Sequence, residues 1–228
     1  MIRLAKRVRQ EIVRLRQTYD VVVVSYGGSG TTVLADVLGR SLRVNAPNSE
    51  RDGILHAISP THPVFSKLKV HRAIYVFADP PRAVLSLFNR DYQSRMLVKI
   101  GSMHHNRAEY LRNIKAYTKP FTFTDLLQCG RDPFQIGRHL KNWTSPESSR
   151  FPILCLKYDA LFESKSIIAE FVGSPKIAEA IPDRRPRRAR LDDLKPTERE
   201  ALLRLYEKES EMYSAMPDVF QPSASGLD

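Results

Sequence analysis

Cysteine is scarce in this chain, and its two cysteines do not indicate a cross-linked or metal-bound protein. Cys129 and Cys155 are the only ones among 228 residues, and Cys155 lies in the apolar run ILCL. A buried free thiol is typical of such a position. We therefore expect neither a disulfide framework nor a zinc site, and no metal cofactor.

Long hydrophobic runs are also missing. No stretch approaches the roughly 18 apolar residues that a membrane-spanning helix needs, and the first residues lack the apolar core of a secretory signal. The sequence therefore predicts a cytoplasmic protein. Its composition is 42% hydrophobic and 27% charged, so we expect residues 1–228 to form a single domain.

Acidic residues are fewer than basic ones, and the resulting net charge of +11 favours an anionic partner. Residues 1–16, within the N-terminal segment 1–18, have the pattern of a basic amphipathic helix. Such a helix could contact a membrane surface peripherally, act as an organellar transit peptide, or simply pack on the domain. These alternatives stay open.

A second basic cluster begins the C-terminal segment 182–228. Its arginines lie between and after two prolines, which predicts a loop rather than a helix. The loop is either a solvated run of charge or a clamp for phosphate, and the lack of interleaved aromatic residues argues against nucleic acid. The arginines are Arg184, Arg185, Arg187, Arg188 and Arg190.

The most informative stretch is VVVVSYGGSGTT, residues 21–32. Four valines predict a strand buried on both faces, and a helix is expected to begin immediately after the small-residue loop. The free amides of that helix, together with nearby hydroxyls, would face an anion. The alternative is that the glycines only make a tight turn. The chain lacks the lysine of a nucleotide-triphosphatase P-loop. The predicted loop residues are Gly27, Gly28, Ser29, Gly30, Thr31 and Thr32.

Further strands and helices alternate along the chain. Residues 73–78 predict a second buried strand, followed by a helix with Asp79 as its N-cap and apolar positions up to Tyr92. Residues 54–58 have the pattern of a short strand, and residues 93–145 are expected to be a mostly helical substrate region. FPILCLKYDAL predicts a third strand and SIIAEFV a helix, and Thr197 with Glu200 predicts a capping box before one long helix. The predicted fold class is α/β, with a central parallel sheet flanked by helices.

Taken in order, these segments resemble the sulfotransferases that use 3'-phosphoadenosine 5'-phosphosulfate (PAPS). SYGGSGTTVL resembles the family's 5'-phosphosulfate loop, and IYVFADPPRAVLSLF resembles its 3'-phosphate segment. The later stretch from FTFTDLL to FPILCLKYDAL also follows the family's order, so the resemblance covers residues 20–172. It implies a P-loop-like sulfotransferase architecture, PAPS as the nucleotide cofactor, and a hydroxyl or amine acceptor of unknown identity.

The resemblance also implies roles for particular residues. The loop from Ser29 to Thr32 would hold the 5'-phosphosulfate, Ser86 the 3'-phosphate, and Tyr158 would lie near the adenine. Arg82, Arg187 and Arg188 are candidates for further phosphate contacts. His56 and His62, in HAISPTHP, are the candidates for a catalytic base.

Four positions depart from the family pattern. Gly28 stands where the family has a lysine, Ala78 where it has an arginine, Val33 where it has a tryptophan, and Ile58 where it has a histidine. A charged donor lost from such a site costs about two to three orders of magnitude in rate. Two alternatives to a sulfotransferase therefore remain, a catalytically impaired protein that binds a nucleotide or anion and a nucleotide-dependent phosphotransferase.

Overall fold

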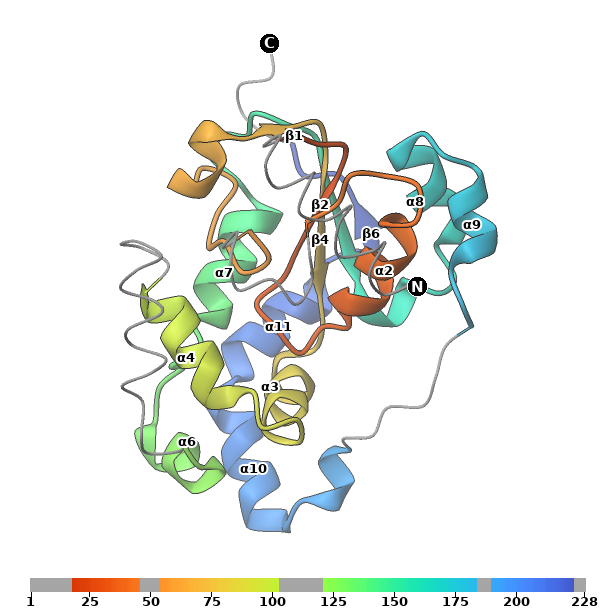
Figure 1. Cartoon of the computed structure of the whole chain (residues 1–228). Helices are drawn as coiled ribbons and strands as arrows, with labels where there is room; N and C mark the ends of the chain where they lie inside the picture. Colours follow the sequence, from red (N-terminus) through yellow and green to blue (C-terminus); the bar gives the residue numbers. More distant parts are fainter. Residues whose placement is uncertain (1–17, 46–53, 103–120, 184–189, 224–228) are drawn as a thin grey trace, which may run out of the picture.

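The computed structural model describes residues 18–45, 54–102, 121–183 and 190–223, which form a mixed α/β structure with mostly parallel strands (Figure 1). The strands are β1 (Thr18–Tyr19), β2 (Val22–Val24), β3 (Lys69–Val70), β4 (Ala73–Phe77), β5 (Ile153–Lys157) and β6 (Val219–Phe220). The α-helices are α2 (Thr31–Leu38), α3 (Pro80–Phe88), α4 (Gln93–Ser102), α6 (Phe123–Cys129), α7 (Ile136–Thr144), α8 (Lys165–Val172), α9 (Lys176–Ala180), α10 (Pro196–Leu205) and α11 (Glu207–Ala215). Short 3-10 turns are η1 (Pro63–Lys67), η2 (Tyr158–Ala160) and η3 (Leu191–Asp193).

The central sheet has the order β2-β4-β5-β6. Strands β2, β4 and β5 are parallel, whereas β6 pairs antiparallel with β5. Every residue of β2, β4 and β5 is buried, as a sheet covered on both faces requires. A separate two-stranded parallel pair, β1 with β3, lies just before β2 and β4 in the chain.

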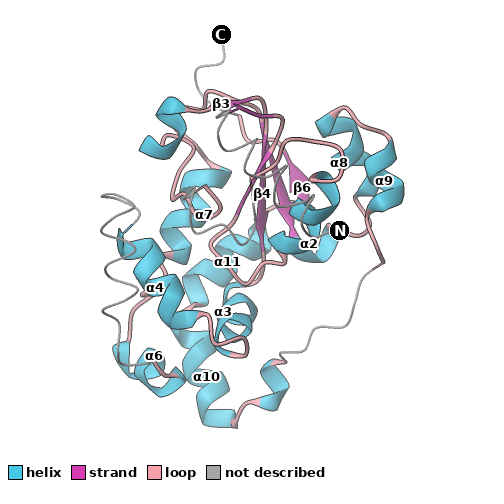
Figure 2. Ribbon diagram, viewed as in Figure 1, coloured by secondary structure: helices cyan, strands magenta, loops and turns pink. Residues whose placement is uncertain are grey.

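Helices cover the two faces of the sheet in separate layers (Figure 2). On one face, Val23, Ile74 and Leu154 pack with apolar residues of α2, α8 and α9. On the other face, Tyr75 and Cys155 pack with α3, α4, α6, α7 and α10. Alternate strand residues thus supply two apolar clusters, one on each side of the sheet.

Helix α7 is fixed at its N-terminus by a carboxylate. Asp132 accepts hydrogen bonds from the amides of Phe134 (3.0 Å), Ile136 and Gly137 (3.4 Å). It also accepts the hydroxyl of Tyr206 at 3.0 Å. Burial raises the pKa of Asp132, and these hydrogen bonds act in the opposite direction. A single side chain therefore joins α7 to the end of α10.

The main strands and helices expected from the sequence are confirmed within the described ranges. Helix α2 begins at Thr31, β4 spans Ala73–Phe77, and Asp79 is the N-cap of α3. Strand β5 and helix α8 also lie where they were expected, and Cys155 is a buried free thiol. In the described part of residues 93–145, α4, α6 and α7 account for the expected helical content.

Three local predictions were wrong. Residues 54–58 form turns and no strand: the Leu55 carbonyl accepts the Ser25 amide, but the carbonyls of Ala57 and Ile58 accept side chains of α7. The C-terminal helix begins after Lys195, whose amide donates to Glu198, and is interrupted at Tyr206 to give α10 and α11. Tyr92 lies beyond α3 and is 41% exposed, so it does not extend the apolar face of that helix.

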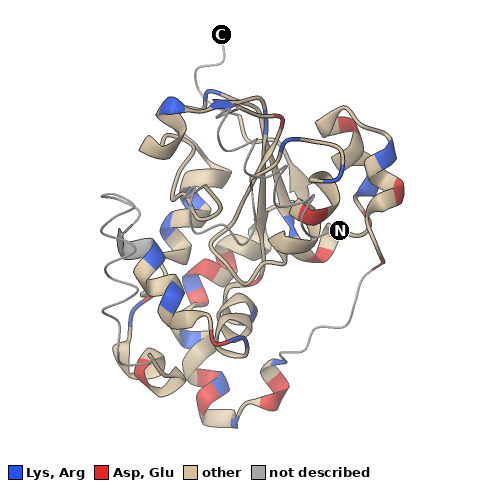
Figure 3. Ribbon diagram, in the orientation of Figure 1, with Lys and Arg blue, Asp and Glu red and all other residues tan. Residues whose placement is uncertain are grey.

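Charged residues of both signs are spread over the helices (Figure 3). Helices α10 and α11 carry several glutamates, whereas α4 carries Arg95 and Lys99. Among the residues that the structure describes, no helix combines the length and apolarity that crossing a bilayer requires. The basic segment 1–16 lies outside these residues.

Replacing Asp132 with alanine should lower the free energy of unfolding by about 2–3 kcal/mol, since it removes a helix cap and leaves the Tyr206 hydroxyl without its acceptor. Urea denaturation measures this loss. Asp125→Ala is the matched control, because Asp125 accepts the Thr122 amide at the start of α6 in a more exposed setting. We expect about 1 kcal/mol for the control. Equal losses in the two variants would contradict a special role for Asp132.

Candidate functional site

The loop after β2 adopts a conformation that depends on its glycines. Gly28 has φ +70° and Gly30 has φ +68°, a region that other residues rarely enter. A Cβ at Gly28 would lie 2.2 Å from the carbonyl oxygen of Ala83, and one at Gly30 would lie 2.0 Å from the ring of Tyr158. The loop therefore packs directly against the first turn of α3 and the residue that follows β5.

The loop ends in a row of main-chain amides that have no acceptor within the described part of the chain. The Gly27 amide bonds the Ser25 hydroxyl at 3.1 Å, and the Ser29 hydroxyl donates to the Gly27 carbonyl at 3.1 Å. No such partner is recorded for the amides from Gly28 to Thr32. Because α2 starts at Thr31 without a side-chain cap, these amides and the positive end of the helix are available to an anion.

The loop also lies where the order of the strands reverses. After α2 the chain returns to form a parallel bridge between Val44 and Val21, and the Asn45 side chain bonds the main chain of Val23 at 2.7 and 2.9 Å. Strand β4 occupies the opposite edge of β2. In open α/β sheets, ligands bind beyond the carboxyl ends of the strands at such a switch point.

Tyr26 ties this loop to the end of β4. Its hydroxyl accepts the amide of Ala78 at 2.9 Å and donates to the carbonyl of the same residue. Burial raises the pKa of Tyr26 well above its ordinary value, so the phenol stays protonated and can serve both bonds. The two strand-to-helix turns are therefore held at a fixed separation.

The other residues expected to bind the cofactor differ in their exposure to solvent. Tyr158 is half-buried and its ring lies against Gly30. Ser86 is half-buried on α3, and its carbonyl accepts Nε of Arg90 at 2.9 Å. Arg82 is exposed and lies 3.6 Å from Asp79. Arg187 and Arg188 lie outside the described residues.

His56 lies beside the loop. Its Nδ1 is 2.7 Å from the carbonyl oxygen of Ser25, and because a carbonyl only accepts, Nδ1 carries the proton and Nε2 has the lone pair. Burial lowers the pKa of His56 to about 3, the charge of Lys99 adds to this, and the Ser25 carbonyl opposes it. His56 is thus a neutral imidazole at pH 7.

His62, the other expected base, forms a hydrogen bond within its own turn. Its Nδ1 accepts the Val64 amide at 3.2 Å, which caps η1. The side chain is buried. Of the two histidines, His56 is the one that bonds the main chain at the start of the loop.

Helix α7 holds the segment that carries His56. The indole Nε1 of Trp143 donates to the Ala57 carbonyl at 2.8 Å, and Nδ2 of Asn142 donates to the Ile58 carbonyl at 3.1 Å. Together with the bond from the Ser25 amide to the Leu55 carbonyl (2.8 Å), they satisfy main-chain carbonyls of this segment. The position of His56 therefore depends on α7.

Three residues near the site could not be selected from the sequence. Met96 of α4 would lie 3.1 Å from a Cβ at Gly27, and Lys99, one turn further along α4, acts electrostatically on His56. His139 of α7 is fully buried and also influences His56. An isolated lysine or histidine in a helix is most often a surface or core residue, so sequence spacing alone could not select them.

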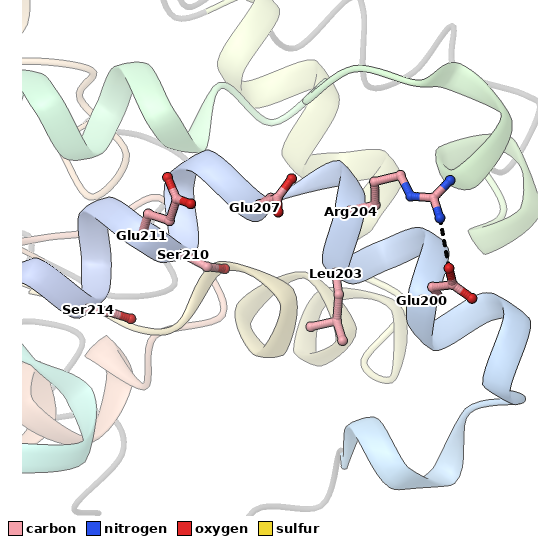
Figure 4. Close-up of a pocket in the computed structure, with 7 residues that line it drawn as sticks. All are labelled: Glu200, Leu203, Arg204, Glu207, Ser210, Glu211 and Ser214. Carbon is pink, nitrogen blue, oxygen red and sulfur yellow. Dashed lines mark hydrogen bonds and ion pairs between the residues drawn. The ribbon is translucent and has the colours of Figure 1, made fainter.

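A separate groove of about 620 Å³ runs along α10 and α11 (Figure 4). Arg204 and Glu200 form an ion pair there at 2.7 Å. The loop residues and His56 do not line this groove. Its lining residues are Glu200, Leu203, Arg204, Glu207, Ser210, Glu211 and Ser214.

Metal binding finds no support in the described ranges, where no group of three or more potential metal ligands is present. Comparison of the chain with models of protein families, with curated proteins and with solved structures gave no match. The function must therefore be argued from the loop and its surroundings.

Replacing Gly30 with alanine tests the close approach of Tyr158. Gly173→Ala is the matched control, because Gly173 has the same φ of +68° but nothing within 4 Å of its would-be Cβ. Both variants should lose about 1 kcal/mol from backbone strain, and Gly30→Ala should lose about 1–3 kcal/mol more from the clash. Thermal or urea unfolding measures the free energy of unfolding of both variants. Equal losses would show that the Tyr158 ring moves aside without a measurable loss of stability.

The fully buried His139 should make stability depend on pH. Burial lowers its pKa to about 3, so between about pH 6.5 and that value the unfolded chain binds a proton that the folded chain does not. The free energy of unfolding should therefore fall by about 2 kcal/mol from this residue between about pH 7 and about pH 5. Urea unfolding of wild type and His139→Phe across this range measures the contribution. Parallel curves would contradict it.

Proposed function

We propose that the chain is a PAPS-dependent sulfotransferase with a P-loop-like sulfotransferase architecture, which moves a sulfuryl group to a hydroxyl or amine acceptor. The observation that carries the proposal is the run of unpartnered amides from Gly28 to Thr32 at the start of α2. The order of the motifs around it, from the loop to Tyr158, supports PAPS over other anions.

The residues present fit the phosphosulfate end of such a cofactor. The amides from Gly28 to Thr32 have no recorded acceptor among the described residues, and donors already in place stabilise charge without reorganisation. The aromatic ring of Tyr158 lies beside Gly30. On the 3'-phosphate side, Ser86 is the candidate on α3.

His56 is the proposed base. PAPS supplies the sulfuryl group, whose bond to the leaving phosphate oxygen breaks as the acceptor oxygen or nitrogen bonds to sulfur in line. Nε2 of His56 would take the acceptor's proton, while Nδ1–H stays on the Ser25 carbonyl. A pKa of about 3 is low for this task, but an anion bound at the neighbouring loop raises it, because negative charge favours the imidazolium form.

Lys99 is the candidate for the positive charge that the loop does not carry. It lies close enough to His56 to lower the pKa of that imidazole. It stands on α4, whose Met96 packs on Gly27. A cation placed there would stabilise the leaving phosphate.

A second candidate function is anion or nucleotide binding without catalysis. Arg82 already contacts Asp79 at 3.6 Å, and Ala78, where the family has an arginine, is fully buried. These features favour a weakened 3'-phosphate site. A phosphotransferase using a nucleoside triphosphate is disfavoured, since the loop has no lysine.

Calorimetry with the desulfated cofactor, 3'-phosphoadenosine 5'-phosphate, tests the proposal. We expect a Kd below about 100 μM, equivalent to about 5.5 kcal/mol, and weaker binding of ATP. Sulfate transfer from PAPS to a panel of alcohols and amines then separates the enzyme from the binding protein. No binding of the desulfated cofactor would refute the sulfotransferase, and tighter binding of ATP would favour the phosphotransferase.

Thr32→Ala should weaken binding of the desulfated cofactor about tenfold, through loss of one hydrogen bond to a charged group. Thr32 is exposed at the start of α2. Thr124→Ala, on the exposed side of α6, is the matched control and should bind as wild type does. An unchanged Kd in Thr32→Ala would place the anion elsewhere.

A further inference from the structure

Arg90, just beyond the end of α3, is held in place but has no recorded acidic partner in the described part of the chain. It is exposed, its Nε donates to the Ser86 carbonyl at 2.9 Å, and its Cζ lies 5.8 Å from the centre of the Tyr92 ring. That distance is within the range of a cation–π contact. The two Nη atoms have no recorded partner among the described residues, so this guanidinium can still donate hydrogen bonds to an anion.

The turn after α3 fixes Arg90 and Tyr92 beside each other. The amides of Asp91 and Tyr92 donate to the carbonyls of Phe88 (3.0 Å) and Leu87 (2.9 Å), and Asp91 has φ +53°. A helix that ends in this way has its last carbonyls satisfied and gives the chain a defined path. Main-chain hydrogen bonds therefore set the positions of the arginine and the ring.

Arg90 also continues the side of α3 that packs on the loop after β2. A Cβ at Gly28 would lie 2.2 Å from the Ala83 carbonyl oxygen, and one at Gly27 would lie 3.4 Å from the Leu87 side chain. Positions 83, 87 and 90 are separated by four and three residues, a spacing that places them on one side of a helix. The side of α3 that meets the loop therefore leads to Arg90.

Ser86 lies between the loop contact and Arg90 on this helix. It is half-buried, and no hydrogen bond from its hydroxyl to a described residue is recorded. It follows Ala83 by three residues, which is about 4.5 Å along the helix axis, and the Nε bond to its carbonyl brings the Arg90 guanidinium back toward the same turn. Ser86 and Arg90 thus place a hydroxyl and a cation about one helical turn from the part of α3 that touches the loop.

The other arginine of this strand-to-helix unit is less suited to a phosphate. Arg82 lies 3.6 Å from Asp79, so a carboxylate already offsets part of its charge. Ala78, where the resemblance implies an arginine, is fully buried and carries no charge. Arg90 is therefore the described arginine of this unit whose charge is still available.

We propose that Ser86 and Arg90 form a second anion subsite, which holds the 3'-phosphate of a nucleoside 3',5'-bisphosphate while its 5' group lies on the amides from Gly28 to Thr32. The inference rests on the proposed function and deepens it, because it assigns to Arg90 the positive charge that Ala78 lacks. A planar guanidinium suits a phosphate, since it can donate two parallel hydrogen bonds. A nucleotide with a 5'-phosphate alone reaches only the loop, so the protein selects its ligand by the second phosphate.

Calorimetry on the full-length protein, at one fixed ionic strength, compares 3'-phosphoadenosine 5'-phosphate with AMP, which lacks the 3'-phosphate. We expect wild type to bind the bisphosphate at least about tenfold more tightly, because it gains charge-assisted hydrogen bonds. Arg90→Gln should reduce this preference to about twofold and leave the Kd for AMP within about twofold, since AMP has no phosphate at the second anion subsite. Arg90→Lys should give an intermediate preference, because lysine keeps the charge but not the paired donors.

Arg138→Gln is the matched control and should keep the wild-type preference. Arg138 is also exposed, and its Nη1 donates to Gln135 at the start of its own helix, α7, at 3.3 Å. Equal losses for the two ligands in Arg90→Gln would mean that Arg90 only caps α3, and an unchanged preference would place the 3'-phosphate elsewhere. Either result overturns the proposal.

The wild-type measurements separate failure of this inference from failure of the proposed function. If wild type binds AMP and the bisphosphate equally well, the loop remains an anion site but the second anion subsite is refuted. If wild type binds neither ligand, the sulfotransferase is refuted together with this subsite.

Discussion

The site depends on how closely two strand-to-helix turns approach one another. Tyr26 bonds both the amide and the carbonyl of Ala78, and the main chain at Gly28 lies against the carbonyl of Ala83. A side chain at position 28 would have to separate the turns or break the left-handed conformation that aims the amides. The contact that shapes this loop therefore excludes a lysine at position 28, so in the proposed function the positive charge comes from another element such as α4.

A second constraint joins the proposed base to the end of α10. Tyr206 bonds Asp132, Asp132 caps α7, and α7 holds residues 57 and 58 through Trp143 and Asn142. His56 in turn bonds Ser25 at the entrance of the loop. Each link is a hydrogen bond with at least one buried or half-buried partner, so a change at the end of α10 has a physical route to the imidazole.

The parts of the fold that the sequence predicted are those with strong local patterns. The valines of β2, the apolar run of β4 and the Asp-Pro start of α3 each specify their own structure. The strand predicted at residues 54–58 is absent, because the carbonyls of Ala57 and Ile58 accept side chains of α7, which lie more than 80 residues away in the sequence. His139 and Lys99 could not be found for a related reason: only the packing of α7 and α4 brings them to His56.

The short antiparallel strand β6 has a consequence for association between chains. Without it, β5 would present an unpaired row of amides and carbonyls at the edge of the sheet, the arrangement that templates pairing with another chain. The amide of Lys157 instead donates to the carbonyl of Asp218, and the two side chains form an ion pair at 3.2 Å. Strand β6 thus covers part of the edge of β5, and the buried Lys157 side chain links the two strands through its ion pair with Asp218. This pairing leaves less of β5 open to another chain.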